Sequence, residues 1–264
     1  MYIKENIKID INTNQIFELI IQKLENKEPL SVVRIGDGEI ATLLNDPNHE
    51  GCVQFYKTHL GRLPKINYME EISNNLKSSI INSDIIGIPP ENVERGPNPY
   101  WSISRDTISK ILNEGPTNKN KKFCSMNIHY DLSSTGKLDE ILSRVDEVYL
   151  VTSRDVKSQL LEKFHNIKKI HVHKIPGEYK YEDNKKYEDY YPTIYKQIEI
   201  DFKNKNLSGK LLLIGGGFVG KNLASIFAQS GGVSIDIGSI FDLFVGKITR
   251  GLGKGPNKYG KPIL

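Results

Sequence analysis

The sequence predicts an α/β fold, a single three-layer α/β/α Rossmann-like domain with a mainly parallel sheet. Short apolar runs of strand character alternate with helical stretches of about 10–15 residues, which is typical of parallel strands connected by helices. The runs lack the apolar–polar alternation of a strand with one solvated face, so both faces of the sheet should be covered. The length of 264 residues suits one such domain.

Seven strands are expected, each of five or six residues. They lie at residues 31–36, 84–89, 122–126, 147–151, 169–174, 210–214 and 233–237. Apolar residues at helical spacing predict the connecting helices. These helices lie around residues 16–24, 40–44, 69–81, 102–112, 138–144, 156–164, 193–203 and 221–229. Ligands of such sheets bind beyond the carboxyl ends of the strands, so the residues that follow each strand are the candidate site residues.

Positive charge gathers at the end of the chain. The 36 basic and 32 acidic residues give a net charge of +4, and no acidic residue follows Asp242. Five basic residues do follow it: Lys247, Arg250, Lys254, Lys258 and Lys261. This end is also rich in Gly and Pro. We therefore divide the chain into a domain at residues 1–245 and a basic tail at 246–264, which is either a solubilising end or a contact for an anionic partner such as a membrane surface.

The composition excludes several classes of protein. No apolar run approaches the ~20 residues of a membrane-spanning helix, and the first residues lack the pattern of a secretory signal. Cys52 and Cys124 fit no metal or redox spacing, so we expect buried, reduced thiols in a cytoplasmic protein. No basic stripe interleaved with aromatic residues runs through the chain, which argues against a nucleic-acid partner. Any membrane contact should be peripheral, through the basic tail.

The first candidate site follows the first expected strand directly, at residues 34–39, Arg-Ile-Gly-Asp-Gly-Glu. The carboxylates of Asp37 and Glu39 can converge on one point, and glycines such as Gly36 permit the turn. Carboxylate oxygens suit Mg²⁺ or Mn²⁺, which takes further ligands from substrate phosphates. Arg34 adds a guanidinium that can pair with phosphate. The alternative is a tight turn whose acids cap the next helix, with Asp37 as the N-cap residue.

This strand–Arg-x-Gly-Asp-Gly-Glu–helix arrangement resembles the signature of the GT-D-type glycosyltransferases, a family with an Asp-x-Glu metal-binding motif. The likeness extends to residues 211–221 and to the Asp-Ile-Gly segment at 235–239. The resemblance implies transfer of a sugar from a nucleoside diphosphate donor with a divalent metal, and it implies that Asp37 and Glu39 are the metal-linked acids. Some members have His directly after Asp-Ile-Gly; this chain has Ser239, so no role is carried over to that position.

The second candidate site is a glycine motif near the end of the chain. Residues 215–220 satisfy Gly-x-Gly-x-x-Gly after an apolar strand, and Asp236 lies 21 residues after Gly215, as in a dinucleotide-binding fingerprint. Only 44 residues follow Gly220, too few for the further units of a complete dinucleotide domain. Backbone N–H groups at a glycine-lined helix start favour an anion, and Lys221 adds a cation. The alternative is close helix–strand packing that binds nothing.

Three further residues are weaker candidates for contact with the donor. Arg105 begins a helix after a Pro-rich loop and is either a phosphate ligand or part of a surface ion pair. Ser153 and Arg154 directly follow the strand at 147–151, where they either contact the donor or belong to the cap of the next helix.

These observations predict a metal-dependent glycosyltransferase that moves a sugar from a nucleoside diphosphate sugar, such as a UDP-sugar, to a glycan, glycolipid or glycoprotein acceptor. The family's setting implies surface polysaccharide or glycoprotein assembly. Mn²⁺ or Mg²⁺ would be held by Asp37 and Glu39. The donor-binding candidates are Arg34, Gly36, Asp37, Arg105, Ser153, Arg154, Gly215, Gly216, Gly217 and Lys221. If the reaction inverts, the candidate bases are Asp242, Asp236 and Glu178. The alternatives are an NAD(P)-binding oxidoreductase, a nucleotide-binding regulatory domain, and a binding module whose acids only cap a helix.

Overall fold

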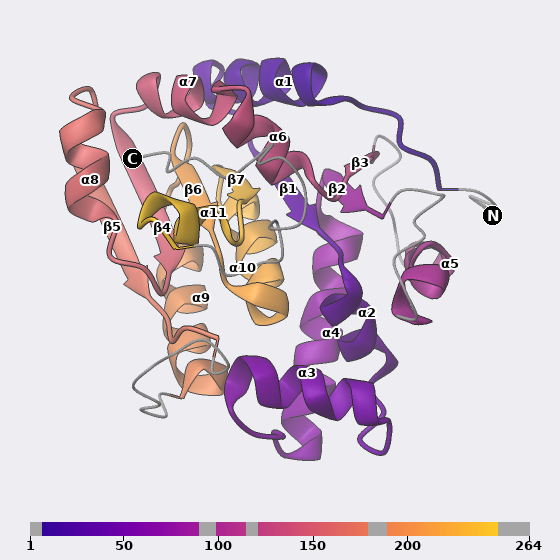
Figure 1. Cartoon of the computed structure of the whole chain (residues 1–264). Helices are drawn as coiled ribbons and strands as arrows, with labels where there is room; N and C mark the ends of the chain where they lie inside the picture. The colour runs from indigo at the N-terminus through magenta and orange to yellow at the C-terminus, as the bar shows by residue number, and fades with distance from the viewer. Residues whose placement is uncertain (1–6, 90–98, 115–120, 179–188, 248–264) are drawn as a thin grey trace.

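The computed structural model describes residues 7–89, 99–114, 121–178 and 189–247 (Figure 1). Its strands are β1 (Leu30–Arg34), β2 (Ile85–Ile88), β3 (Lys122–Ser125), β4 (Glu147–Thr152), β5 (Lys169–Lys174), β6 (Leu211–Ile214) and β7 (Val233–Asp236). Its helices are α1 (Thr13–Glu25), α2 (Asp37–Leu44), α3 (Glu50–Leu60), α4 (Ile66–Asn82), α5 (Pro99–Glu114), α6 (Ile128–Ser134), α7 (Lys137–Ser143), α8 (Lys157–Lys163), η2 (Tyr190–Ile194), α9 (Tyr195–Lys203), α10 (Gly217–Gln229) and α11 (Ile240–Phe244).

The strands form one seven-stranded sheet in the order β3-β2-β1-β7-β6-β4-β5. Every neighbouring pair is parallel; Val32 of β1, for example, lies opposite Ile85 of β2 and Ile235 of β7. Each predicted strand is present, within two residues of the expected bounds. The predicted α/β class is confirmed. The central strands β1, β2, β6 and β7 are buried on both faces, whereas the edge strand β5 alternates between buried and more exposed residues.

Two hydrophobic clusters cover the two faces of the sheet and make three layers. Val33 and Ile214 point into the cluster that contains apolar side chains of α2, α3, α4, α5, α9 and α10. Val32 and Leu213 point into the cluster that contains side chains of α1, α6, α7, α8 and α11. Figure 1 shows α1 and α7 side by side, away from α3 and α4. Successive residues of one strand thus serve opposite layers.

Three helices of the structure, α3, α6 and α11, were not expected from the sequence. With seven and five residues, α6 and α11 are too short to show an apolar periodicity. The longer α3 buries only Cys52 and Tyr56, so its apolar stripe is weak. These helices depend on packing against the rest of the domain rather than on their own pattern.

The two cysteines lie in the core. Cys52 and Cys124 are free and buried, as their spacing predicted. Among the residues with described positions, none belongs to a helix that is both long and apolar enough to span a bilayer. The proposed basic tail lies almost entirely in residues 248–264, outside the described residues, and therefore stays a prediction.

The carboxyl edge of the sheet contains a crevice at its centre. After β1 the chain turns into α2 on one face, whereas after β7 it turns into α11 on the other face. Because β1 and β7 are neighbours, their connections diverge, and such a divergence is where α/β sheets bind ligands.

Candidate active site

A cavity of about 550 Å³ lies at this carboxyl edge. It is lined by residues that follow β1, β3, β4, β5, β6 and β7. The predicted site residues among them are Arg34, Gly36, Asp37, Glu39, Ser153, Arg154, Glu178, Gly215, Gly216, Gly217, Lys221, Asp236 and Asp242. The structure thus brings together in one cavity nearly all the candidates that the sequence marked after separate strands.

Arg105 is the exception. Its guanidinium donates hydrogen bonds to the backbone oxygen of Pro89 at 2.8 and 3.2 Å and to that of Ile7 at 2.6 Å. It is not among the residues that line the cavity. The expectation that Arg105 lies at the donor site is therefore wrong for this structure, because its donor groups are used to hold the loop after β2 to the N-terminal segment.

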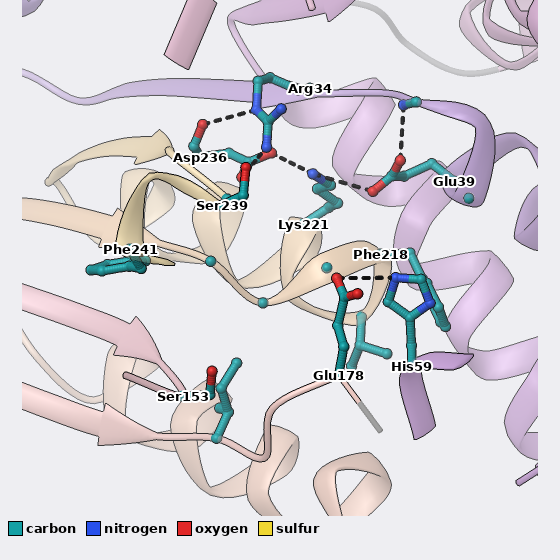
Figure 2. A pocket seen from close by; sticks show the side chains of 18 of the residues that line it. Arg34, Glu39, His59, Ser153, Glu178, Phe218, Lys221, Asp236, Ser239 and Phe241 are labelled. Atoms are coloured by element: carbon teal, nitrogen blue, oxygen red, sulfur yellow. Dashed lines mark hydrogen bonds and ion pairs between the residues drawn. The ribbon is translucent and has the colours of Figure 1, made fainter. Parts of the chain in front are cut away.

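Asp236, at the end of β7, lies between two cations (Figure 2). Arg34 donates from Nη2 to Asp236 Oδ1 at 3.2 Å and from Nε to its backbone oxygen at 3.1 Å. Lys221 pairs with the other carboxylate oxygen. Burial by itself would raise the pKa of Asp236, but the charges and hydrogen bonds of Arg34 and Lys221 outweigh it and lower the pKa below its ordinary value. Asp236 is therefore a buried anion that positions two cations, and it is a poor proton acceptor.

Arg34 has a further partner that the sequence did not indicate. Its Nη1 lies 3.0 Å from Nε2 of His129, a buried residue of α6. The neighbouring Tyr130 is hydrogen-bonded through its hydroxyl to Ser239 at 2.8 Å. Ser239, at the position where some family members have His, is thus tied to the wall of the cavity, and the guanidinium of Arg34 is held from β7 and α6 together.

Glu39 both caps α2 and pairs with Lys221. Its Oε2 accepts a hydrogen bond from the backbone N–H of Gly36 at 2.8 Å, and its Oε1 lies 3.2 Å from Nζ of Lys221. Asp37 is the first residue of the helix, and its Oδ1 accepts from the N–H of Gly38 at 3.0 Å. The N-cap residue is Gly36 rather than Asp37, and the capping carboxylate comes from Glu39. Both acids therefore bond to backbone N–H groups at the start of α2 and also line the cavity.

The glycine turn after β6 combines tight packing with access to the cavity. A Cβ on Gly215 would lie 2.7 Å from the Phe241 ring, and one on Gly216 would lie 2.6 Å from the Tyr190 hydroxyl. Gly217 has φ +57°, a conformation that side chains disfavour. The close-packing interpretation thus accounts for Gly215 and Gly216, but both still line the cavity with Gly217.

The start of α10 also faces the cavity. Its first helical hydrogen bond runs from the N–H of Gly220 to Gly216, so the N–H groups of Gly217, Phe218 and Val219 have no acceptor within the helix. These three residues line the cavity, close to Lys221 on the same helix. Free N–H groups and the helix dipole make this an attractive position for an anion.

This arrangement argues against the dinucleotide interpretation. In that fingerprint, the acid after the next strand accepts hydrogen bonds from a ribose. Here the equivalent Asp236 is only 4% exposed, and its carboxylate oxygens contact Arg34 and Lys221. The acid is occupied by cations of the chain itself.

Asp242 is likewise paired. Its Oδ1 lies 2.5 Å from Nε of Arg154, and the two side chains are 14% and 11% exposed. The pair joins the loop after β4 to α11 across the cavity wall. Ser153, which precedes Arg154 on this loop, also lines the cavity (Figure 2). Of the three candidate bases, Asp236 and Asp242 are thus bound to cations.

The third candidate, Glu178, faces a histidine that the sequence did not mark. Its Oε1 lies 3.4 Å from Nε2 of His59, near the end of α3 (Figure 2). The His59 ring packs edge-on against Phe218 with centroids 5.1 Å apart and stacks on Phe55 at 6.2 Å. No local spacing connects positions 59 and 178, so only the tertiary approach of α3 to the segment after β5 could reveal this pair.

Within the described part of the chain, no group of three or more His, Cys, Asp or Glu side chains is arranged to hold a metal ion. A cation that shares a substrate diphosphate needs only one or two protein carboxylates. Asp37 and Glu39 are of that type and number, and they lie on the same wall as the cations suited to phosphate. The residues therefore fit a metal that binds together with a phosphate ligand.

Comparisons with known proteins agree with this architecture. A search of curated proteins finds no match, but three solved structures share the fold. One is a selenomethionine-substituted domain of unknown function 1792, with 18% identity and a TM-score of 0.53, covering 89% of this chain and 79% of that one. A second, described as having a distinct glycosyltransferase fold, has 19% identity and a TM-score of 0.51 over the same shares. The third, a glycosyltransferase of this domain type from Streptococcus sanguinis, has 18% identity and a TM-score of 0.52, covering 90% and 83%.

At these identities, the structural likeness establishes the fold. The family is established by sequence: a model of the GT-D fold-like domain matches residues 11–244. This match includes the turn after β1 with Asp37 and Glu39, the glycine turn after β6, and the Asp-Ile-Gly segment after β7. The chain therefore belongs to the GT-D-like family, and it has a glycosyltransferase fold.

Proposed function

We propose that this protein is a metal-dependent glycosyltransferase that moves a sugar from a nucleoside diphosphate sugar, of the UDP-sugar class, to a glycan, glycolipid or glycoprotein acceptor. One observation carries the proposal. The carboxylates of α2 and the glycine-lined start of α10 line the same cavity, joined by the ion pair between Glu39 and Lys221. The family's setting supports a role in surface polysaccharide or glycoprotein assembly.

The diphosphate of the donor would lie at the start of α10. The N–H groups of Gly217 and Phe218 can donate to its oxygens, and Lys221 and Arg34 supply fixed positive charge. Both cations are already oriented by Asp236, so they need little rearrangement when charge develops on the leaving diphosphate. Such prearranged donors stabilise the transition state.

Asp37 and Glu39 would hold Mn²⁺ or Mg²⁺. When bound, the ion supplies Lewis-acid stabilisation of charge on the diphosphate. Glu39 would keep its bond to the Gly36 N–H through Oε2 and would hold the ion through Oε1, in place of the present contact of that oxygen with Lys221. Asp37 lies in the first turn of the same helix, and it also lines the cavity.

A thermal-shift screen of nucleoside diphosphate sugars, each with and without Mn²⁺, tests the proposal. Stabilisation grows as RT ln(1 + [L]/Kd), so a ligand at a hundredfold excess over Kd adds ~2.7 kcal/mol. We expect one donor class to raise the melting temperature more with Mn²⁺ than without it. Stabilisation by NAD(P) alone, independent of metal, would contradict the proposal.

Glu39→Gln provides the matching variant. Gln can still accept from the Gly36 N–H but lacks the charge that a metal and Lys221 need, so the Mn²⁺-dependent part of the shift and of turnover should be lost. Glu50→Gln is the control, because Glu50 is also in the first turn of a helix but is exposed outside the cavity. A folded Glu39→Gln protein with wild-type metal-dependent turnover would exclude the metal role.

A further inference from the structure

The feature that the proposed chemistry leaves unexplained is the contact between His59 and Glu178. Both residues line the cavity, and their side chains are 14% and 22% exposed. His59 comes from α3, whereas Glu178 follows β5, so two distant segments meet here. Their meeting point adjoins the start of α10: a Cβ on Gly217 would lie 3.4 Å from Cδ2 of His59.

The orientation of the imidazole determines which nitrogen can accept a proton. Nδ1 of His59 lies 2.9 Å from the backbone oxygen of Phe55. A carbonyl oxygen only accepts hydrogen bonds, so Nδ1 carries the hydrogen. In the neutral ring, Nε2 therefore has the lone pair, and this is the atom that faces Glu178 (Figure 2).

Nε2 and the carboxylate oxygen are 3.4 Å apart. In the neutral ring both atoms are acceptors, so their contact becomes favourable once a proton lies between them. A proton taken up at Nε2 makes an imidazolium beside a carboxylate, which stabilises the charge. The aromatic rings of Phe55 and Phe218 hold the imidazole in this position.

We propose that His59 is the general base of the transfer reaction and that Glu178 stabilises the imidazolium that forms when His59 takes up the proton. The inference rests on the proposed glycosyltransferase function. The acceptor hydroxyl oxygen forms a bond to the anomeric carbon, and the bond from that carbon to the diphosphate oxygen breaks, with its electron pair leaving on the diphosphate. The hydroxyl proton passes to Nε2 of His59. Attack on the face opposite the leaving group inverts the anomeric configuration.

The other two acids considered as candidate bases are less suited to this role. Asp236 is enclosed by Arg34 and Lys221, and Asp242 lies 2.5 Å from Arg154. Cations stabilise the ionised carboxylate and weaken it as a base. The His59–Glu178 contact has the opposite property, since it favours the protonated product of the transfer.

The test measures release of the nucleoside diphosphate from the donor, with water or a simple glycoside as acceptor. His59→Asn keeps an N–H near the Phe55 oxygen but removes Nε2. We expect kcat to fall at least 100-fold, within the range for general-base catalysis, while the KM for the donor and the donor-induced thermal shift stay near wild type. Glu178→Gln should lower kcat less, again with little change in KM.

Two further readouts separate a base from a structural residue. Added imidazole should restore part of the activity of His59→Ala, because it can take the proton in place of the missing side chain. Proton NMR of the first product should show inversion. His171→Asn is the matched control: His171 also contacts a carboxylate, Glu147 at 2.6 Å, but it lies outside the cavity, so its kcat should stay unchanged.

The outcomes distinguish the two proposals. If the wild type transfers the sugar, three results would each overturn the assignment of the base and leave the transferase function standing. These are a wild-type kcat in His59→Asn, no rescue of His59→Ala by imidazole, and retention of the anomeric configuration. Failure of the wild type to bind or cleave any nucleoside diphosphate sugar would overturn the function, and the base with it.

Discussion

Lys221 lies 3.2 Å from Glu39 and also contacts Asp236, so a single ammonium group joins α10 to the turn after β1 and to the end of β7. The side chain is 6% exposed, and its two partners are 12% and 4% exposed. Taking three charges out of water is costly unless each is compensated. The network therefore keeps the cavity wall in one arrangement.

Replacing Lys221 with Met should destabilise the fold by about 3 kcal/mol, because Asp236 and Glu39 lose a partner at a buried position. Urea unfolding monitored by circular dichroism would measure the loss. Lys203→Met is the control, since Lys203 is 57% exposed in its pair with Glu199 and should change stability by less than ~1 kcal/mol. Equal losses of unfolding free energy in the two variants would show that the buried network stabilises the fold no more than an exposed ion pair does.

Gly238→Ala should displace Arg34. Gly238 has φ +48°, and a Cβ there would lie 2.2 Å from Nη2 of Arg34. Gly136 has φ +76° with nothing within 4 Å of such a Cβ, so Gly136→Ala carries only the backbone cost of about 1–2 kcal/mol. We expect Gly238→Ala to lose more stability than Gly136→Ala and also to weaken the donor-induced thermal shift. A donor response equal in the two variants would contradict the role of Arg34.

The pH dependence of the free energy of unfolding should show the contribution of the Glu147 carboxylate, which lies outside the cavity. Its carboxylate is 2.6 Å from Nε2 of His171 and 2.5 Å from Nζ of Lys210. Burial would raise the pKa of Glu147, but Lys210 and His171 outweigh it and lower the pKa from 4.5 to about 2. A folded-state pKa below the unfolded one means that the contribution to stability is complete above pH 4.5 and is lost as the pH falls through about 2.

Glu147→Gln should therefore be less stable than the wild type at pH 7 by about 1–2 kcal/mol, allowing for screening by solvent. The difference should shrink as the pH falls from 4.5 toward 2. Urea titrations at a series of pH values would measure it. A difference that stays constant across this range would mean that the charge of Glu147 does not stabilise the fold.

The sequence by itself determined the elements of the sheet and the position of the site along the chain. Parallel strands covered on both faces are continuous apolar runs, which made the central strands visible. The edge strand β5 alternates, Lys-Ile-His-Val-His-Lys, and was also expected at the bounds it has, Lys169–Lys174. The site was visible because glycines and charged side chains directly follow β1 and β6. Residues 34–39 and 215–221 could thus be assigned to one edge before the strand order was known.

Only the tertiary structure decided which side chains meet. The partners Arg154 and Asp242 are 88 positions apart, and Arg34 and His129 are 95 apart, so their contacts depend on the strand order and on which face each helix covers. Apolar periodicity indicates that a residue is buried, but it does not indicate which residue packs against it. For the same reason Arg105 was expected at the donor site, although its guanidinium donates to backbone oxygens elsewhere in the fold. His59 was not identified from the sequence, because the apolar stripe of its helix is too weak to be recognised.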